Sequence, residues 1–199
     1  GAGGPSLGSQ LEDLRGDVWL STVGPMSLMR WDRATGRIVD LTAEAGVVAE
    51  FASFCNGPDG SVWIGTGNYG GQLATNGGLL RYSNGRFDRL TVADGVPDGW
   101  LRALYVDRAG RLWIASSLGG LVRVDDPAAE RPRFVAYTTA EGLSSDNVWC
   151  VVEDLWGRIY AGTTRGVDRI DLKSGAVRHY TSADGLPKTQ PQCAFRDRN

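Results

Sequence analysis

The sequence predicts an all-β protein built from repeated units, and three observations support this prediction. Glycine makes up 28 of the 199 residues while hydrophobic residues make up 42%, a combination typical of many short strands joined by tight turns. No segment shows the sustained 3.6-residue periodicity of a helix, so we expect no helix in the body of the chain. A glycine also precedes an aromatic residue by three positions, with a spacing between copies of 44 to 50 residues, at Gly16/Trp19, Gly60/Trp63, Gly110/Trp113 and Gly157/Tyr160.

Each unit is expected to contain four short strands. The first precedes the polar turn, at 7–14, 101–106, 148–153 and 192–195, and the second contains the repeated aromatic residue. The third carries an arginine in every copy, namely Arg30, Arg81, Arg123 and Arg169. The fourth ends on a threonine, and turn pairs such as Asn84-Gly85 supply the positive φ that the hairpin before it requires.

Four-stranded antiparallel units at this period predict a β-propeller. We expect four blades at about 7–42, 50–91, 100–138 and 147–181, with 191–199 as the first strand of a further blade. The aromatic row should lie between blades, where each tryptophan removes roughly 150–250 Å² from water. Two alternatives remain open, a segment of a larger propeller and a complete four-bladed ring.

One complete unit carries a recognisable pattern. It reads Asp-Arg-Ala-Gly-Arg-Leu-Trp-Ile-Ala at 107–115, Gly-Gly-Leu-Val-Arg-Val-Asp at 119–125, Phe-Val-Ala-Tyr-Thr at 134–138 and Glu-Gly-Leu-Ser-Ser-Asp-Asn-Val at 141–148. This resembles the two-component regulator propeller repeat. The resemblance implies a seven-bladed propeller in the extracytoplasmic, periplasmic sensor region of a histidine kinase, including hybrid kinases. Its partners would be the remaining blades and the downstream signalling domains of the parent chain.

Composition excludes several classes of function. The net charge is −2 and no basic stripe is present, which argues against nucleic-acid binding. No apolar run approaches the roughly 18 residues of a transmembrane helix, and no signal peptide is recognisable. Cys55, Cys150 and Cys193 lack the spacing of a metal site, and we interpret Cys150 and Cys193 as buried strand residues. We expect no metal and no cofactor.

Catalytic patterns are also weak. His179 is the single histidine and lies on a predicted outermost strand, where we expect a solvated side chain. The pattern G-x-G-x-x-G at 65–70 lacks room for the helix that dinucleotide binding requires. Acidic residues recur once per unit at turns, which favours turn hydrogen bonds over acid–base catalysis. The third-strand arginines are expected either to form structural ion pairs or to extend into solvent. No kinase motif is present.

The strongest functional candidates lie where the repeat is broken. The link between the second and third strands is lengthened in the second unit by an insert at 67–77, which carries amides and a tyrosine. This link shares one face of a propeller with the links between blades, and loops on a rigid scaffold are where binding residues concentrate. Amides, hydroxyls and aromatic rings suit neutral polyols or oligosaccharides. The candidate ligand-binding residues are Asn68, Tyr69, Gln72, Asp98, Trp100, Arg102, Asp146 and Trp149.

The favoured interpretation is a non-catalytic sensor module that binds a small molecule or glycan and signals to a kinase outside this chain. One alternative is a protein-interaction scaffold, and a further one is a propeller lyase, which would need a catalytic histidine and a metal site. If expressed alone, four blades would leave open sheet edges, so instability or self-association is expected.

Overall fold

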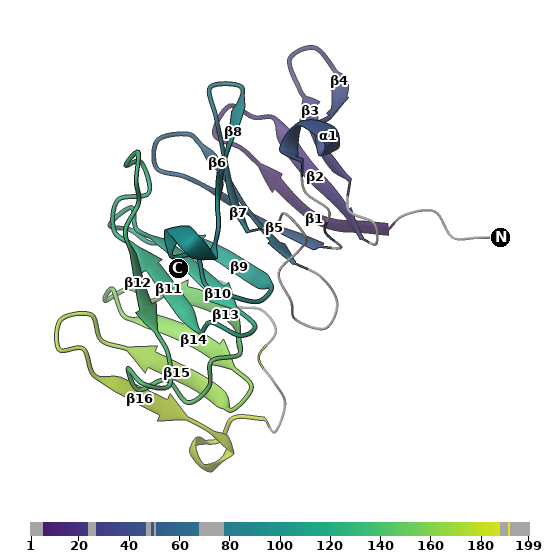
Figure 1. Ribbon diagram of the computed structural model, residues 1–199. Helices are drawn as coiled ribbons and strands as arrows, with labels where there is room; N and C mark the ends of the chain where they lie inside the picture. The colour runs from purple at the N-terminus through teal and green to yellow at the C-terminus, as the bar shows by residue number, and fades with distance from the viewer. Residues whose placement is uncertain are drawn as a thin grey trace.

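The computed structural model describes residues 6–23, 27–46, 49, 51–67, 78–187 and 191. Within these residues the strands form four separate sheets, each with four antiparallel strands in chain order (Figure 1). The predicted all-β propeller with four-stranded blades is therefore confirmed. The predicted further strand at 191–199 falls almost entirely outside the described residues.

The four sheets are numbered as blades in chain order. Blade 1 contains β1 (Ser6–Glu12), β2 (Val18–Val23), β3 (Leu28–Asp32) and β4 (Arg37–Asp40). Blade 2 contains β5 (Phe51–Asn56), β6 (Val62–Gly67), β7 (Leu79–Ser83) and β8 (Arg86–Leu90). Blade 3 contains β9 (Leu101–Val106), β10 (Leu112–Ser116), β11 (Leu121–Val124) and β12 (Phe134–Tyr137). Blade 4 contains β13 (Val148–Glu153), β14 (Ile159–Thr163), β15 (Gly166–Ile170) and β16 (Val177–Tyr180).

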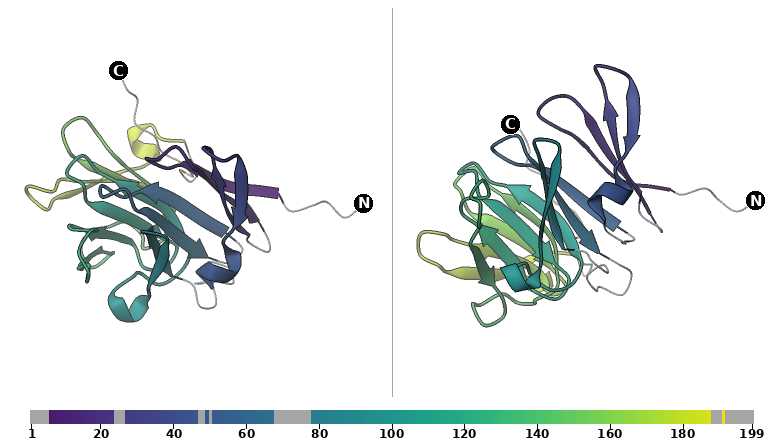
Figure 2. Two further views of the ribbon diagram at one scale, coloured as in Figure 1. Left: turned by 90° about the horizontal axis from the view of Figure 1, so that it is seen from above. Right: turned by 45° about the horizontal axis from the view of Figure 1, so that its top comes forward.

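The blades follow one another face to face, and their first strands contact each other on the inner side, β1 with β5, β5 with β9 and β9 with β13 (Figure 2). The connection between the last two strands ranges from a two-residue hairpin in blade 2 to the nine residues 125–133 in blade 3. In blade 2 it contains Asn84 and Gly85, with φ of 50° and 78°, as type I′ hairpins require. Strand order and hairpins together place the first strand innermost and the fourth strand outermost in each blade.

The hydrophobic core lies between blades. Trp19, Trp63 and Trp113 are fully buried, and each lies in a cluster that joins its own blade to the next one. The residues of the next blade that share these clusters are Val62, Ile64 and Leu80, then Leu112, Ile114 and Val122, then Val151, Ile159 and Ala161. The prediction that the aromatic row separates the blades is confirmed for these three residues.

The polar turn before each second strand is organised by an aspartate in blades 1, 3 and 4. In blade 3 the buried Asp107 accepts hydrogen bonds from the backbone N–H groups of Ala109 and Arg111 at 2.9 and 3.0 Å, and from Arg111 Nε at 2.7 Å. It also accepts one from Trp113 Nε1 at 2.8 Å. Asp13 accepts from Trp19 Nε1 in the same way at 2.9 Å. The turn therefore satisfies the polar edge of the tryptophan that it positions.

The links between blades contain short helical turns, so the expectation of no helix was wrong at this scale. They are α1 (Thr42–Ala45), η1 (Val92–Asp94) and η2 (Ser182–Asp184). In η1 and η2 a threonine and an acidic residue three positions later form a capping box; in η1, Asp94 accepts a hydrogen bond from the Thr91 backbone N–H at 2.8 Å. Glu141 accepts from Thr138 at 2.9 Å in the same manner. The predicted role of these acids in turns is confirmed.

The third-strand arginines brace the blades from the side. Arg81 pairs with Asp59 at 2.5 Å, and Arg123 donates to the Tyr137 hydroxyl at 2.6 Å and to Asp125 at 3.1 Å. Arg30 lies 3.8 Å from Asp17. The predicted structural role is confirmed for these three arginines, whereas Arg169 Nε is buried without a hydrogen-bond partner. Cys55 and Cys150 are buried strand residues, as the predicted role of Cys150 requires, and burial raises the pKa of the Cys55 thiol to about 12. Cys193 lies outside the described residues.

Candidate functional site

The candidate site lies where the links between blades meet the links between second and third strands. Backbone hydrogen bonds tie these two sets of loops together: Ser117 N–H donates to the Trp100 carbonyl at 3.0 Å, and Thr164 N–H donates to the Asn147 carbonyl at 3.2 Å. Because strand order alternates direction, both sets of loops lie at the same end of the blades. The described loops among those that the sequence singled out therefore share one face, whereas residues 68–77 of the insert lie outside the described residues.

Three of the predicted site residues come together at this face. Trp100 directly precedes β9, Arg102 is on β9, and Trp149 is on the neighbouring inner strand β13. The Arg102 guanidinium carbon lies 3.4 Å from the centroid of the Trp149 ring and 4.9 Å from that of the Trp100 ring. We name Trp100, Arg102 and Trp149 the indole–guanidinium cluster. Such cation–π contacts stabilise a guanidinium where water is partly excluded.

The local chain geometry explains why the three side chains meet. Arg102 and Trp149 occupy the second position of equivalent inner strands, five residues before Asp107 and Asp154 respectively, so neighbouring blades bring them together. Trp100 in turn lies on the backbone of Gly67 at the end of β6. A Cβ at that glycine would fall 2.1 Å from Trp100 Cδ1, so only glycine admits the indole. The cluster thus spans features of blades 2, 3 and 4.

Three polar atoms of Arg102 and Trp149 are enclosed without hydrogen-bond acceptors. Arg102 Nε, Arg102 Nη1 and Trp149 Nε1 are buried and make no hydrogen bond. Burial also lowers the pKa of the Arg102 guanidinium, although an arginine keeps its charge at neutral pH. The cluster is therefore a positively charged site with unused donors.

The other predicted site residues are placed differently. Asp98 is exposed and accepts a hydrogen bond from the Gly99 backbone N–H at 2.7 Å, whereas Asp146 accepts from the backbone N–H and hydroxyl of Thr139 at 2.6 and 3.2 Å. These two carboxylates hold the links between blades. Asn68, Tyr69 and Gln72 lie outside the described residues, so their predicted role stays a prediction.

A polar network that the sequence analysis missed lies in blade 4. The buried Asp168 accepts from the Ser144 hydroxyl at 2.9 Å and pairs with His179 Nδ1 at 2.7 Å. His179 is half-exposed, but it is held by this carboxylate rather than simply solvated. Cross-strand pairing of residues 168 and 179 was the available signal. Because the carboxylate, not the imidazole, is in the middle, the histidine is not placed to activate the serine.

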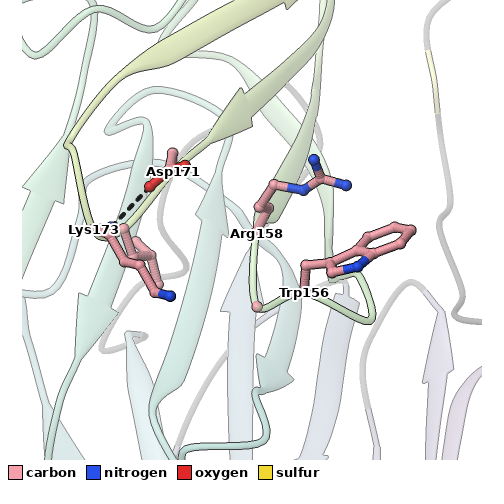
Figure 3. A pocket seen from close by; sticks show the side chains of 6 residues that line it. Trp156, Arg158, Asp171 and Lys173 are labelled. Carbon is pink, nitrogen blue, oxygen red and sulfur yellow. Dashed lines mark hydrogen bonds between the residues drawn. The ribbon is translucent and has the colours of Figure 1, made fainter.

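A shallow pocket lies at the opposite end of blade 4, between the β13–β14 and β15–β16 turns (Figure 3). Trp156 is 73% exposed there, and the Arg158 guanidinium carbon lies 4.7 Å from its ring centroid. Asp171 accepts from the Lys173 backbone N–H at 2.9 Å. Within the described residues, no group of three or more histidine, cysteine, aspartate or glutamate side chains is placed to hold a metal ion.

The residues around the cluster match a known protein family. A family model described as the two-component regulator propeller matches residues 95–117, which contain Trp100 and Arg102. Residues 95–117 thus match one two-component regulator propeller repeat. The resemblance stated from the sequence is thus confirmed, with the matched residues covering the entry into blade 3 and its first two strands. A search of curated proteins found no match.

Solved structures share the propeller fold at low sequence identity. The extracellular domain described as that of a hybrid two-component system from B. thetaiotaomicron superposes with a TM-score of 0.79 at 20% identity, covering 96% of this chain and 25% of that one. PorZ of the type-IX secretion system of Porphyromonas gingivalis gives 0.65 at 15% identity, covering 89% and 27%. Virginiamycin B lyase from Staphylococcus aureus gives 0.58 at 13% identity, covering 94% and 58%. The chain spans about a quarter of the length of the first two.

Proposed function

We propose that the chain is a ligand-sensing segment of a β-propeller in the extracytoplasmic region of a two-component, hybrid sensor histidine kinase. The observation that carries this proposal is the coincidence of the propeller-repeat match at 95–117 with the indole–guanidinium cluster. The ligand is a small molecule or an oligosaccharide. The chain itself performs no catalysis, and phosphoryl transfer belongs to kinase domains of the parent protein.

A periplasmic location follows from the same proposal. Structures with this fold include an extracellular domain of a two-component system. The described residues contain no helix that is both long and apolar enough to cross a bilayer, so this proposal assigns the membrane anchor to another part of the parent protein.

The outer faces of the blades support the presence of further blades as partners. In blades 2 to 4, apolar residues of the third and fourth strands, such as Tyr82 and Phe87, pack against the tryptophan of the preceding blade. The equivalent residues of blade 1, Trp31 and Ile38, are 40% and 62% exposed. An additional blade placed against this face would cover them, as blade 1 covers blade 2.

Signalling requires that the ligand distinguish two states of the parent protein. A ligand that binds the cluster only when the blades and the following domains adopt one arrangement shifts the population toward that arrangement. Because the cluster joins β9 and β13, its occupancy is coupled to the packing of blades 3 and 4. This coupling is how a site on loops can affect domains far along the chain.

The experiment is a thermal-shift and calorimetric screen of the full encoded protein against a library of mono- and oligosaccharides. We expect at least one sugar to raise the unfolding temperature, and to change autophosphorylation of the attached kinase. Deletion of residues 68–77 should weaken binding if Asn68, Tyr69 and Gln72 contribute. A parent gene without kinase motifs, or a folded protein that binds no sugar, would overturn the proposal.

A second candidate function is a protein-interaction scaffold, which the exposed Trp31, Ile38 and Trp156 favour. Sedimentation of the 199-residue chain tests it. Unfolding or self-association through the open blade faces is expected if further blades normally cover them. A compact monomer with a sharp unfolding transition would instead favour an independent scaffold.

A further inference from the structure

Arg102 differs from the arginines that brace the blades. Arg30, Arg81 and Arg123 each have an aspartate within ion-pair distance. Arg102 has two indole rings within cation–π distance, but no carboxylate among the described residues forms an ion pair with it. A partly desolvated guanidinium without a counter-charge is unfavourable unless something pairs with it. Arg102 therefore lacks an anionic partner, whereas each of the other three arginines already has one.

The geometry of the cluster restricts what can satisfy this requirement. Stacking on Trp149 occupies one face of the guanidinium plane, so further partners must bind along its edges. Two of the three edge nitrogens, Nε and Nη1, are enclosed without an acceptor, as is Trp149 Nε1. Arg102 Nη2 is the nitrogen of this fork that is not enclosed. A ligand oxygen can reach Nη2 directly. A planar group with two acceptor oxygens can also pair with a neighbouring nitrogen of the fork once the side chains that enclose that nitrogen move aside on binding.

A carboxylate has that shape and charge. Arginine and carboxylate form two parallel N–H···O bonds in one plane, which are shorter and stronger than bonds to neutral hydroxyls. A neutral polyol would leave the charge of Arg102 uncompensated. Asp98 and Asp146, the nearby acids in sequence, are bonded within their own loops, and neither forms an ion pair with Arg102.

We propose that Arg102 binds a carboxylate of the ligand, so that the sensed sugars are uronates rather than neutral oligosaccharides. This inference rests on the proposed function, since it assigns a chemical class to the ligand of that same site. Arg102 makes the charged contact, while Trp100 and Trp149 position its guanidinium. The sequence analysis predicted neutral polyols at this face, and the uncompensated charge of Arg102 favours the anionic class instead.

The test compares glucuronate- and galacturonate-terminated oligosaccharides with their glucose- and galactose-terminated counterparts, by calorimetry on the full encoded protein. We expect the uronates to bind about 10- to 100-fold more tightly, as one charge-assisted bidentate pair supports. Arg102→Met should remove this preference, so that uronates and their neutral counterparts bind with similar affinities. Arg102→Lys, which keeps the charge but loses the planar fork, should retain only part of it.

Arg178→Met is the matched control. Arg178 also lies over an aromatic ring, 4.8 Å from the centroid of Tyr180, but on the outermost strand β16. It should leave every affinity unchanged. A sulfated sugar that binds more tightly than the uronate would overturn the carboxylate assignment, as would equal binding of neutral and uronate sugars that Arg102→Met does not affect.

Two further outcomes separate this inference from the proposed function. If neutral sugars bind and signal but uronates do not, the sensor function stands and the carboxylate inference fails. If Arg102→Met lowers the unfolding temperature without changing any affinity, Arg102 contributes to the stability of the fold and not to binding, and the inference also fails. If a folded protein binds no sugar of either class, the proposed function fails with it.

Discussion

Blades 2 and 3 each bury a tryptophan at the equivalent position, but the indole N–H is treated differently in the two blades. In blade 3 the Asp107 carboxylate accepts from Trp113 Nε1 and from Arg111. In blade 2 the equivalent position is Gly57, and Trp63 Nε1 is buried without an acceptor although Trp63 is as fully buried as Trp113. The apolar surface of the indole ring is therefore sufficient to place the tryptophan between two blades. The hydrogen bond to its edge is an additional contribution that one blade lacks.

Blade 2 replaces the missing aspartate with a different contact. Asp59, two positions later, accepts from the Ser61 hydroxyl at 2.6 Å and from Arg81 Nη2 at 2.5 Å. This carboxylate organises the turn and reaches the third strand, but it does not pair with the indole. The turn is therefore preserved in both blades, while the polar edge of the tryptophan is satisfied in only one of them.

The largest expected effect comes from removing the carboxylate of blade 3. Asp107→Ala leaves the Trp113 indole N–H, Arg111 and two backbone N–H groups without their acceptor in a buried turn. We expect the free energy of unfolding to fall by about 3–5 kcal/mol, measured by urea denaturation. Asp126→Ala, at an exposed turn, should change it by less than about 0.5 kcal/mol. Similar small losses for both variants would show that the Asp107 contacts contribute little.

The comparison is sharpened by replacing each tryptophan with phenylalanine. Trp113→Phe leaves Asp107 without one of its buried donors, whereas Trp63→Phe removes an N–H that has no acceptor. We expect Trp113→Phe to cost about 1–3 kcal/mol more than Trp63→Phe. Trp19→Phe serves as a control, because Trp19 is also fully buried and bonded to Asp13, so it should resemble Trp113→Phe. An equal loss for all three would contradict the proposed difference.

Supplying blade 2 with the missing acceptor should stabilise it modestly. A Cβ at Gly57 would lie 3.0 Å from Trp63 Nε1 but only 2.3 Å from Ser61 Oγ and 2.8 Å from Asp59 Oδ1, so the substitution is paired with Ser61→Ala and with Asp59→Ala, the residue that blade 3 has at that turn position. Relative to the Asp59→Ala, Ser61→Ala double variant, we expect Gly57→Asp to raise the free energy of unfolding by about 1 kcal/mol. Destabilisation by the added aspartate would mean that the turn of blade 2 cannot accept the arrangement of blade 3.

The smallest expected effect is on how the stability of the protein changes as the pH is lowered. Burial raises the pKa of the Asp59 carboxyl, but hydrogen bonds from Ser61 and Arg81 outweigh it and hold this pKa below the ordinary value. Its contribution to stability is therefore present above the unfolded pKa of about 4 and is lost as the pH falls through the folded pKa. Unfolding measured between pH 7 and pH 3 should show a shallower acid loss for Asp59→Asn. An unchanged pH profile would exclude this contribution.

The blades could be predicted from the sequence because their signals are local. Gly110 and Trp113 fix a turn and a strand within four residues, and the same spacing recurs in every unit. The sequence also indicates that the Trp63 indole N–H lacks an acceptor, because Gly57 stands where the other units have aspartate. The short helical turn at Thr42–Ala45 was missed, since one turn is too short to show helical periodicity.

The site was predictable only in part. The links that contain Trp100 and flank Arg102 and Trp149 were identified from their position in the repeat, but the cation–π contacts depend on side-chain directions that spacing does not set. The burial of Arg102 without an acid could not be foreseen, because the neighbouring Asp98 and Asp146 look like suitable partners until their bonds within the loops are seen.

The two faces of each blade differ. The indole on one face of a blade packs against small and branched aliphatic residues of the next blade, as Trp113 does against Val151 and Ala161. Every such junction is head-to-tail, so whole units can be gained or lost by gene duplication without inventing a new type of contact. The number of blades in the ring then depends on how many copies of the unit the gene encodes, while the loops of each copy can change in sequence independently.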